Sequence, residues 1–525
     1  MIAIRTGRLI VVLVVMLFLS PAGLVRADGF SGGIGNTFGP RFGADPHRLP
    51  RVPNDLRHRP RPVADAAGWV QHWSQIAIDA TGLDHTPVAP GENRTKYAEQ
   101  LGPGRASRAM AIVHLAMFDA VNAIEGEHKY KSYIGVGPAP FGTSMKAAIA
   151  QAAHDTLVML FPSQASSMDT QLVDDLTEIP DGRLKTNGVA LGRQAAAAIL
   201  AARANDGSQH PEPHIGLEFL TSNDPGKWRQ DPISLIPLAL GAHWSEVKPF
   251  VLERADQFRV PPPPGLDSAA YAAAYNEAKT LGGDGLVTPT TRTSDQTQIG
   301  IYWAYDGTPS LCAPPRLYNQ IAMRIAHKMG TDTDALELAR LLALVNVAMA
   351  DAGIAVWESK YYYQYWRPVT GIREADKDTG PTGLGDGNPA TVGDVTYTPL
   401  GAPASNLTGP NFTPPFPAYP SGHAGFGGAL FEMLRNFYRT DRIAFTFVSD
   451  EFNGVTRDNN GLVRPVVERS FSSLSQAERE NAQSRIYLGI HWAFDATEGI
   501  AQGNRVADYV FKHALLSQHQ RGIGR

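Results

Sequence analysis

Cysteine is nearly absent from this chain. Cys312 is the only one among 525 residues, which excludes an intrachain disulfide and any metal site built from several thiolates. Net charge is small as well, because 47 Lys and Arg stand against 51 Asp and Glu for a formal charge of −4. The chain therefore lacks the basic field with which proteins bind nucleic acid or an anionic membrane. The balance of 43% hydrophobic and 19% charged residues is that of a large globular protein.

Long apolar runs are missing beyond the N-terminus. Arg5 and Arg8 precede an apolar stretch at 9–19, and the sequence VRA at 25–27 resembles a signal-peptidase site. Residues 1–27 are therefore predicted to be a signal peptide, and the mature protein is expected to be secreted or periplasmic. The apolar stretch is too short for a stable membrane span. We expect no span after signal removal, with an uncleaved anchor as the alternative.

Hydrophobic periodicity in the mature chain predicts a mainly α fold. Strand-like alternation is scarce, and the long periodic segments favour bundle packing. Helices are predicted near 107–124, 144–161, 187–205, 266–281, 315–329, 333–366, 422–438, 474–488 and 492–516. His114, His154 and Asp119 lie on apolar helices, where core packing is the expected role.

Composition divides the chain further. Residues 28–65 are rich in Gly, Pro and Arg without apolar periodicity, which predicts a mobile or surface-wrapping arm. An N-terminal helical region is assigned to 66–330 and a C-terminal helical bundle to 331–525. The stretch 371–419 is a long Gly/Pro/Thr-rich loop, which we expect to shape a pocket entrance.

Two cations stand seven residues apart in the segment KYYYQYWRP that begins at Lys360. Seven residues are close to two helical turns, so Lys360 and Arg367 are predicted to leave one face of a helix and to grip one anion. Pro368 disfavours helix at Arg367, which places the pair at a helix end.

A second segment, PSGH at 420–423, predicts a helix start that can bind an anion. Ser421 is a natural N-cap before a helix-compatible run, where free amides and the helix dipole favour negative charge. Gly422 would let an oxyanion approach the backbone without a Cβ in the way. His423 then stands at the rim, placed for proton transfer.

The third segment, SRIYLGIHWAFD, runs from 484 to 495. Arg485 and His491 are six residues apart, about 240° on an ideal helix, so a break near Gly489 is needed for both to face one ligand. His491 and Asp495 are four apart, a spacing at which the carboxylate can hold the imidazole in one tautomer. The pair is typical of a histidine nucleophile or ligand with the group that orients it.

Each segment alone has an ordinary explanation. A Lys and an Arg seven apart are usually a solvated helix face, PSGH is a common turn, and a single His-x-x-x-Asp is usually surface or core. Together they supply three fixed cations, a helix N-terminus and two histidines. That set indicates a site for phosphate or a phosphate-like oxyanion.

The order of the three segments resembles the superfamily of type 2 phosphatidic acid phosphatases, bacterial class A acid phosphatases and vanadium-dependent haloperoxidases. Further segments are similar to fungal-type vanadium chloroperoxidases: IYWAYD at 301–306, PPRLYNQIAMRIA at 314–326, DAGIAVW at 351–357 and PPFPAYPSGHAGFGG at 414–428. The close match covers roughly 297–495. The filler YYYQYW after Lys360 departs from the fungal pattern. The resemblance implies two helical bundles with the site in the second.

The resemblance also implies a role for each matched position. His491 would bind vanadium, His423 would be the acid–base group, and Asp306 would pair with Arg485. Trp357 and Phe416 would line the halide side of the pocket, with Asp495 behind His491. The residues that would hydrogen-bond the oxygens of vanadate are Lys360, Arg367, Ser421, Gly422 and Arg485. Lys360 would in addition make a bound peroxide more electrophilic, and phosphate would compete for the site.

We therefore expect an exported vanadate-dependent haloperoxidase. It would oxidise bromide, with chloride as a second candidate, by hydrogen peroxide, and the hypohalous acid would react with an organic acceptor. The alternative is a soluble acid phosphatase in which His491 attacks phosphorus to form a phosphohistidine and His423 protonates the leaving alcohol. A non-catalytic anion-binding protein is a third reading, disfavoured because two positioned histidines exceed what binding needs. Asp306, Trp357 and Phe416 favour the haloperoxidase.

Overall fold

The computed structural model describes residues 33–44, 49, 65–125 and 129–518. The predicted signal peptide, 1–27, lies outside these ranges, as does most of the arm predicted at 28–65. The fold is mainly α, as predicted from periodicity. Within the described residues, the one sheet is a two-stranded antiparallel hairpin.

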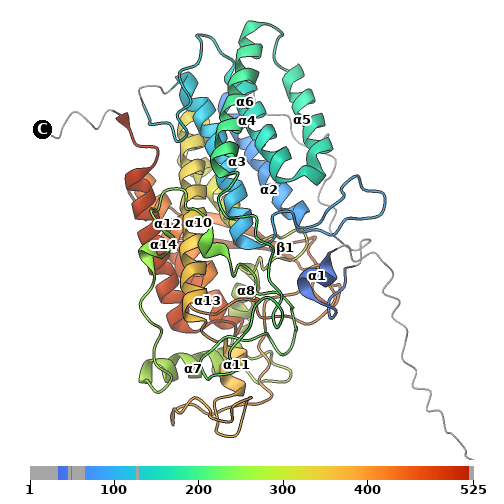
Figure 1. Cartoon of the computed structure of the whole chain (residues 1–525), viewed down its shortest axis with the longest axis vertical. Coiled ribbons are helices and arrows are strands. Elements are labelled where there is room, and N and C mark those ends of the chain that lie inside the picture. Colours follow the sequence, from blue (N-terminus) through green and yellow to red (C-terminus); the bar gives the residue numbers. More distant parts are fainter. Residues whose placement is uncertain (1–32, 45–48, 50–64, 126–128, 519–525) are drawn as a thin grey trace, which may run out of the picture.

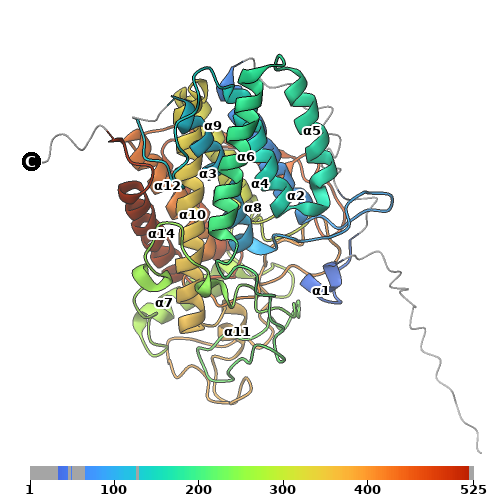
Figure 2. The same ribbon diagram turned by 45° about the horizontal axis from the view of Figure 1, so that its top comes forward.

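The helices before residue 335 form two sets: α2 to α6 gather on one side of the molecule, whereas α7, α8 and α9 contact the C-terminal elements. Figures 1 and 2 show α2 to α6 beside the long central helix, with α1 at the outer edge. Their bounds are α1 Ile34–Phe38, α2 Ala66–Asp84, α3 Gly102–Glu125, α4 Met145–Leu160, α5 Ala165–Thr177, α6 Arg183–Arg203, α7 Ala269–Gly282, α8 Ser294–Tyr302 and α9 Pro314–Met329.

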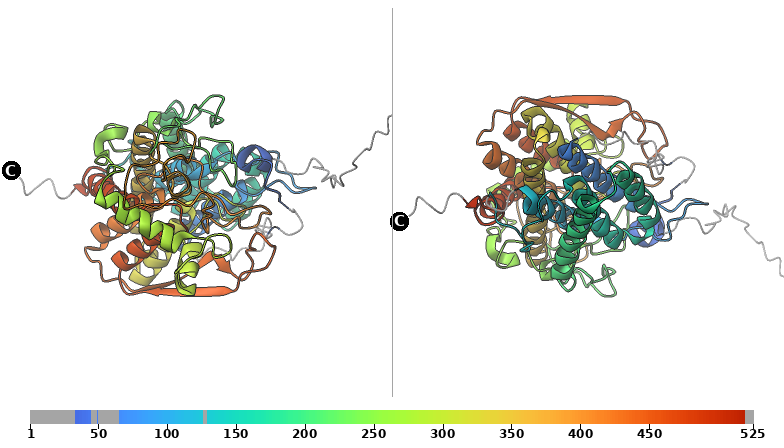
Figure 3. Two further views of the ribbon diagram at one scale, coloured as in Figure 1. Left: turned by 90° about the horizontal axis from the view of Figure 1, so that it is seen from below. Right: turned by 90° about the horizontal axis from the view of Figure 1, so that it is seen from above.

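The remaining elements surround the other side of the central helix. They are α10 Ala335–Tyr363, α11 Pro368–Arg373, α12 Gly422–Tyr438, β1 Phe445–Asn453, β2 Val466–Phe471, α13 Leu474–Tyr487 and α14 Ala493–His513. Helix α10 packs on α3 on one side and on α12 and α14 on the other. Figure 3 shows the β1–β2 hairpin on the outer edge and α7 below the bundle.

Helix α10 is the core helix of the molecule. Among the described residues it alone is long and apolar enough to cross a membrane, but 94% of its most apolar window is buried inside the protein. A helix that is apolar all round is either a membrane span or the centre of a large core. Burial on every side identifies α10 as the latter.

Helices α12 and α14 approach each other through glycine. A Cβ on Gly503 would lie 2.1 Å from the carbonyl oxygen of Gly425, and one on Gly499 would lie 2.7 Å from the carbonyl oxygen of Ser421. Side chains larger than hydrogen would therefore push the two helices apart. The close approach also allows the Ser421 amide to donate to the Asp495 carbonyl at 2.9 Å, which ties the second sequence segment to the third.

All nine predicted helices are present, with ends shifted by a few residues. Five described helices were not predicted: the short α1, α8 and α11, and the longer α2 and α5. Helix α2 buries 14 of its 19 residues, so its apolar residues do not follow one face, and α5 is largely polar with only four buried positions. Helix α2 therefore has no single apolar face, and α5 offers few apolar positions from which to recognise one.

The described part of the predicted arm is packed rather than loose. Ile34, Phe38 and Phe42 are buried in one cluster with Phe412 and Ile490. The ring centroids of Phe38 and Phe412 are 5.5 Å apart in an edge-on arrangement. Residues 33–44 therefore wrap the C-terminal half and close one side of the molecule around the site.

His114, a predicted core histidine, is 1% exposed on α3. Its Nδ1 lies 2.8 Å from the Met110 carbonyl oxygen and its Nε2 lies 3.2 Å from Ser74 Oγ. Burial lowers the pKa of His114 to about 4. The ring is therefore neutral in the folded protein at pH values where an exposed histidine is charged.

We predict that His114→Gln weakens the acid sensitivity of folding. The folded pKa lies below the unfolded value of about 6.5, so the contribution of His114 to stability is complete above pH 6.5 and is lost as pH falls toward 4. At pH 5 the loss amounts to about 2 kcal/mol. Urea unfolding of wild type and His114→Gln at pH 7 and pH 5 gives the free energy of unfolding of each. The difference between their pH dependences is the contribution of His114, because the two proteins share all other titrating groups. An equal pH dependence in the two proteins would contradict it.

Candidate active site

The three predicted cations converge, although Lys360 and Arg367 do not share one helix. Helix α10 ends at Tyr363, Gln364 adopts a left-handed φ of 51°, and Arg367 is the N-cap of α11. The prediction that both side chains leave one helix face is wrong, because the left-handed turn and Pro368 interrupt the helix. The prediction of a helix end between them is confirmed.

Lys360 is fully buried and held by main-chain oxygens. Its Nζ donates to the carbonyls of Pro417 and Ala418 at 2.8 and 2.9 Å, and it lies 5.1 Å from the centroid of the Phe416 ring. Burial lowers the pKa of Lys360 well below its usual range. An ammonium group has three donors, so one N–H remains for a ligand.

The two arginines keep donors without partners. Arg367 donates Nε to the Phe416 carbonyl and Nη1 to the Ile490 carbonyl, at 3.0 and 2.9 Å. Arg485 donates Nη2 to Asp306 Oδ1 at 2.6 Å, the ion pair that the resemblance implied. Arg367 Nη2 and Arg485 Nε and Nη1 are buried with no hydrogen-bond partner. Each buried unpaired donor costs about 1–3 kcal/mol, and three cationic donors in one place match the oxygens of a tetrahedral anion.

His491 presents a lone pair beside these donors. Its Nδ1 lies 2.7 Å from Asp495 Oδ2, and its Nε2 lies 2.8 Å from Arg367 Nη1. A guanidinium only donates, so the network assigns the ring proton to Nδ1 and the lone pair to Nε2. Burial, followed by the charge of Arg367, lowers the pKa of His491 well below its usual range. The predicted orienting role of Asp495 fits this geometry, and the predicted break is confirmed by Gly489, whose φ is 69°.

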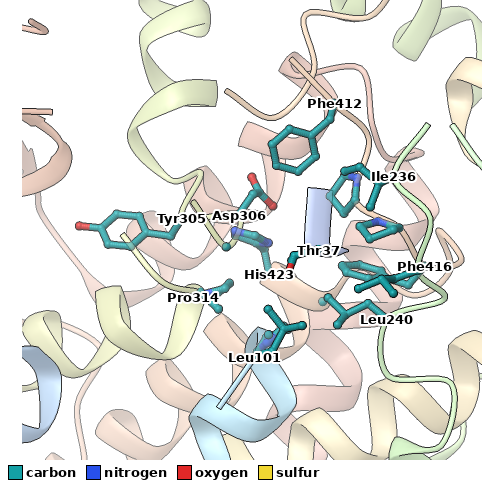
Figure 4. Close-up of a pocket in the computed structure, with 18 of the residues that line it drawn as sticks. Thr37, Leu101, Ile236, Leu240, Tyr305, Asp306, Pro314, Phe412, Phe416 and His423 are labelled. Atoms are coloured by element: carbon teal, nitrogen blue, oxygen red, sulfur yellow. The ribbon is translucent and has the colours of Figure 1, made fainter. Parts of the chain in front are cut away.

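His423 carries the opposite tautomer. Its Nε2 lies 2.5 Å from the Ala304 carbonyl oxygen, which can only accept, so Nε2 carries the proton and Nδ1 is left to exchange one. Burial, followed by the charge of Arg485, lowers the pKa of His423 well below its usual range. Figure 4 shows His423 beside Asp306 on the pocket wall. A neutral imidazole at this place can act as a base.

Ser421 and Gly422 begin α12 as predicted. The Ser421 side chain accepts from the Ala424 amide at 3.4 Å, which makes it the N-cap. A Cβ on Gly422 would lie 3.2 Å from the Trp357 ring and 3.9 Å from Lys360 Cε. A Cβ would crowd the indole but make only an ordinary contact with the lysine. Glycine therefore allows Trp357 to pack closely against the start of α12, a reason that no sequence pattern indicates.

A pocket opens onto these groups. Of the predicted residues, those that line it are Asp306, Trp357, Phe416, Gly422, His423, Arg485 and His491. Lys360, Arg367, Ser421 and Asp495 lie behind this lining. The rest of the lining is mostly apolar and comes from four distant segments, with Thr37, Leu101, Leu240 and Phe412 as examples. No local pattern in the sequence predicts it. We call this space the site pocket.

The β1–β2 hairpin, which was not predicted, holds the segment that carries Ala304 and Asp306. Tyr305 has a left-handed φ of 44°, an unfavourable conformation for a residue with a side chain. Its amide donates to Glu451 Oε1 at 3.3 Å, and its hydroxyl accepts from the Asp450 amide at 2.6 Å. Glu451 in turn pairs with Arg464 at 2.6 Å. The hairpin therefore positions the Ala304 carbonyl, which contacts His423, and the Asp306 carboxylate, which contacts Arg485.

Comparison with known proteins agrees with this geometry. The family model described as the VCPO second helical-bundle domain matches residues 340–519. The vanadium chloroperoxidase of Curvularia inaequalis is 31% identical over an alignment of 509 positions that covers 82% of this chain and 79% of that protein.

Solved structures are similar over most of their length. A bacterial vanadium-dependent iodoperoxidase superposes with a TM-score of 0.65 at 26% identity, covering 85% of this chain and 96% of that one. An apo-type bacterial vanadium-dependent chloroperoxidase has a TM-score of 0.58 at 18% identity, covering 79% and 94%, which shows a shared fold. The identity to the curated relative over this length decides the family: the chain belongs to the vanadium-dependent haloperoxidases.

Proposed function

We propose that this haloperoxidase uses vanadate to oxidise bromide, and also chloride, with hydrogen peroxide. The observation that carries the proposal is the set of three unpartnered guanidinium nitrogens around the His491 lone pair. Among the described residues, no group of three or more His, Cys, Asp or Glu side chains is placed to hold a metal ion. A metal that enters as an oxyanion needs only hydrogen-bond donors and one ligand, which these residues provide.

Vanadate, when bound, would supply a Lewis acid that polarises peroxide. The residues around it have separate tasks. Arg367 and Arg485 would hold the oxyanion by charge-assisted hydrogen bonds, and His491 Nε2 would give up its contact with Arg367 to bind the metal. The remaining N–H of Lys360 would donate to a peroxide oxygen. His423 Nδ1 would take up a proton and return it to the hypohalite oxygen, which then departs as hypohalous acid.

The same groups would serve a phosphatase, so the two reactions must be separated by experiment. We predict that the protein freed of vanadate brominates monochlorodimedone no faster than buffer, and that added vanadate restores the rate, since side chains cannot polarise peroxide comparably. Excess phosphate should lower the restored rate by competing for Arg367 and Arg485. Equal rates with and without vanadate, or phosphate-ester hydrolysis without halogenation, would overturn the assignment.

The halide choice is tested at Phe416. Its ring centroid lies 4.9 Å from that of Trp357 and 5.1 Å from Lys360 Nζ, so it covers the ammonium and keeps water from it. Chloride is harder to oxidise than bromide and needs a more electrophilic peroxide. A hydrogen bond from Lys360 strengthens in such a low-dielectric setting.

We predict that wild type chlorinates at mildly acidic pH and brominates faster. Phe416→His should suppress chlorination more than bromination, because a polar ring admits water to Lys360. Phe412→His, at another lining residue of the site pocket and not one of the rings near Lys360, is the control. A wild type that oxidises bromide and is silent on chloride from pH 4 to 8 would show that Phe416 does not decide the halide.

We also propose export to the periplasm or the medium, on the basis of the charged and apolar pattern in residues 5–27. Sequencing the mature N-terminus, expected at Asp28, checks this.

A further inference from the structure

A second hollow lies directly beside the site pocket. It is bounded by α1, the 98–101 segment, the ends of α4 and α6, and the 208–214 segment. Thr37, Leu101 and Leu238 line both spaces, so the two are neighbours across these three side chains. We call the outer one the acceptor cleft. A small product that leaves the site pocket past Thr37 and Leu101 meets the cleft first.

The cleft combines an apolar floor with a polar edge. Ile112 and Leu160 are buried at its floor, and Leu200 is partly buried beside them. At the edge, Arg105 pairs with Glu212 and its guanidinium lies 5.4 Å from the centroid of the Trp244 ring. The cationic groups at the edge are matched by carboxylates, so the cleft carries no strong field of one sign. Such a surface suits a neutral flat ring with one hydrogen-bonding group.

We propose that the acceptor cleft binds the organic substrate and that its class is a phenol. The inference rests on the proposed function, which supplies hypohalous acid. A ring carbon of the bound phenol attacks the halogen, the carbon–halogen bond forms as the oxygen–halogen bond breaks, and hydroxide leaves. The ring then loses its proton, which joins the hydroxide as water. Binding next to the outlet raises the chance that the oxidant meets the ring before it diffuses away.

The cleft contains a natural reporter of that route. Met159, at the end of α4, lines the cleft and is 67% exposed, whereas Met329, at the end of α9, is 41% exposed and lines neither space. Hypohalous acid converts a thioether to a sulfoxide, with release of halide and a proton, and exposed methionines react first. The two residues therefore compare the outlet with a distant surface of the same molecule.

The first experiment measures binding without turnover. Phenol is titrated by calorimetry into vanadate-loaded protein in the absence of peroxide. Leu200→Glu places a charge against the apolar floor, and Ala204→Trp fills the cleft from an exposed position at the end of α6. Leu184→Glu is the control, because it makes the same leucine-to-glutamate change at an exposed position of the same helix outside the cleft. We expect the two cleft variants to bind phenol at least about tenfold more weakly, and Leu184→Glu to bind as wild type.

The second experiment separates the cleft from the chemistry. Triiodide formation from iodide and peroxide needs no organic acceptor, and it should stay within about twofold of wild type in all three variants, since none of the three residues lines the site pocket. Bromophenol formation should saturate with phenol in wild type and lose saturation in the cleft variants. Absence of triiodide in wild type would mean that the proposed function fails. If wild type forms triiodide normally but neither binds phenol nor shows saturation with phenol, the acceptor-cleft proposal is wrong and the proposed function stands.

The third experiment locates the outlet. After brief turnover with bromide and no acceptor, peptide mass spectrometry should find more sulfoxide at Met159, relative to Met329, than added hypobromous acid produces. Phenol should protect Met159. Equal ratios for internal and added oxidant would contradict an outlet at the cleft.

Discussion

His491→Ala is expected to abolish the retention of vanadate. The alanine variant keeps the donors of Arg367 and Arg485 but removes the Nε2 lone pair beside Arg367, whose tautomer is set by the contact of Nδ1 with Asp495 at 2.7 Å. Hydrogen bonds alone would then hold the anion. Loss of groups that merely support a metal ligand costs about 10–100-fold in affinity, so loss of the ligand itself should cost at least about 100-fold. Equilibrium dialysis with vanadium analysis measures the dissociation constant.

A milder variant supplies the comparison. Asp495→Asn leaves the imidazole in place but weakens the bond that orients it, so the same measurement should show an intermediate loss. Both variants should still bind phosphate weakly, because the guanidinium donors remain. Unchanged vanadate binding in His491→Ala would show that His491 is not the ligand, whatever happens to turnover.

His423→Ala should bind vanadate and lose most of its turnover. His423 forms its hydrogen bond with the Ala304 carbonyl and not with the unpartnered nitrogens of Arg367 and Arg485. Its removal therefore leaves the donors that would bind vanadate in place. Removing general acid–base assistance typically costs about 10² to 10⁴-fold in rate. Bromination at saturating peroxide and dialysis of vanadate on the same preparation give the rate and the affinity together.

The pH profile distinguishes a proton carrier from a structural residue. Burial, followed by the charge of Arg485 and the other nearby cations, lowers the pKa of His423 in the free site. A bound anion would offset part of that positive charge and raise the pKa. The bromination profile of vanadate-loaded wild type should therefore contain a titrating group that the residual bromination of His423→Ala lacks. His327→Ala, an exposed histidine on α9, is the control. Full turnover in His423→Ala would refute the proton-transfer role.

Much of the site was predictable because its rules are local. The N-cap at Ser421 and the break at Gly489 follow from turn and helix chemistry within a few residues. The contact between His491 and Asp495 was predicted for a helical segment. It forms instead at the start of α14, where Asp495 in the first turn reaches back past the N-cap Trp492 to His491. The pair formed by Asp306 and Arg485 depends on chain segments about 180 residues apart, and the resemblance to a family supplied it where spacing could not.

The rest depends on tertiary contacts that leave no local pattern. The path from Lys360 to Arg367 turns at Gln364, whose left-handed conformation is not typical of glutamine. The carbonyl of Ala304 has no sequence signature, because every residue has one. Its position comes from Glu451 on a hairpin whose paired strands lie far from it in the chain. Backbone groups and apolar walls are thus the parts of the site that sequence reasoning missed.

The apolar wall of the site pocket has a consequence for how such enzymes diverge. The matched bundle, 340–519, holds the cations and both histidines, whereas Thr37, Leu101 and Leu240 come from elsewhere. Part of the pocket lining therefore lies outside the segment that carries the anion-binding residues, while Phe416, the residue proposed to affect the halide, lies inside it. Substitutions in the N-terminal half can change this part of the pocket lining, and with it access for halide or acceptor, while the residues that bind the oxyanion stay the same. Two proteins that share all three anion-binding segments can then differ in the halide they oxidise. Exchanging residues 33–44 between two such proteins and measuring halide preference would test this directly.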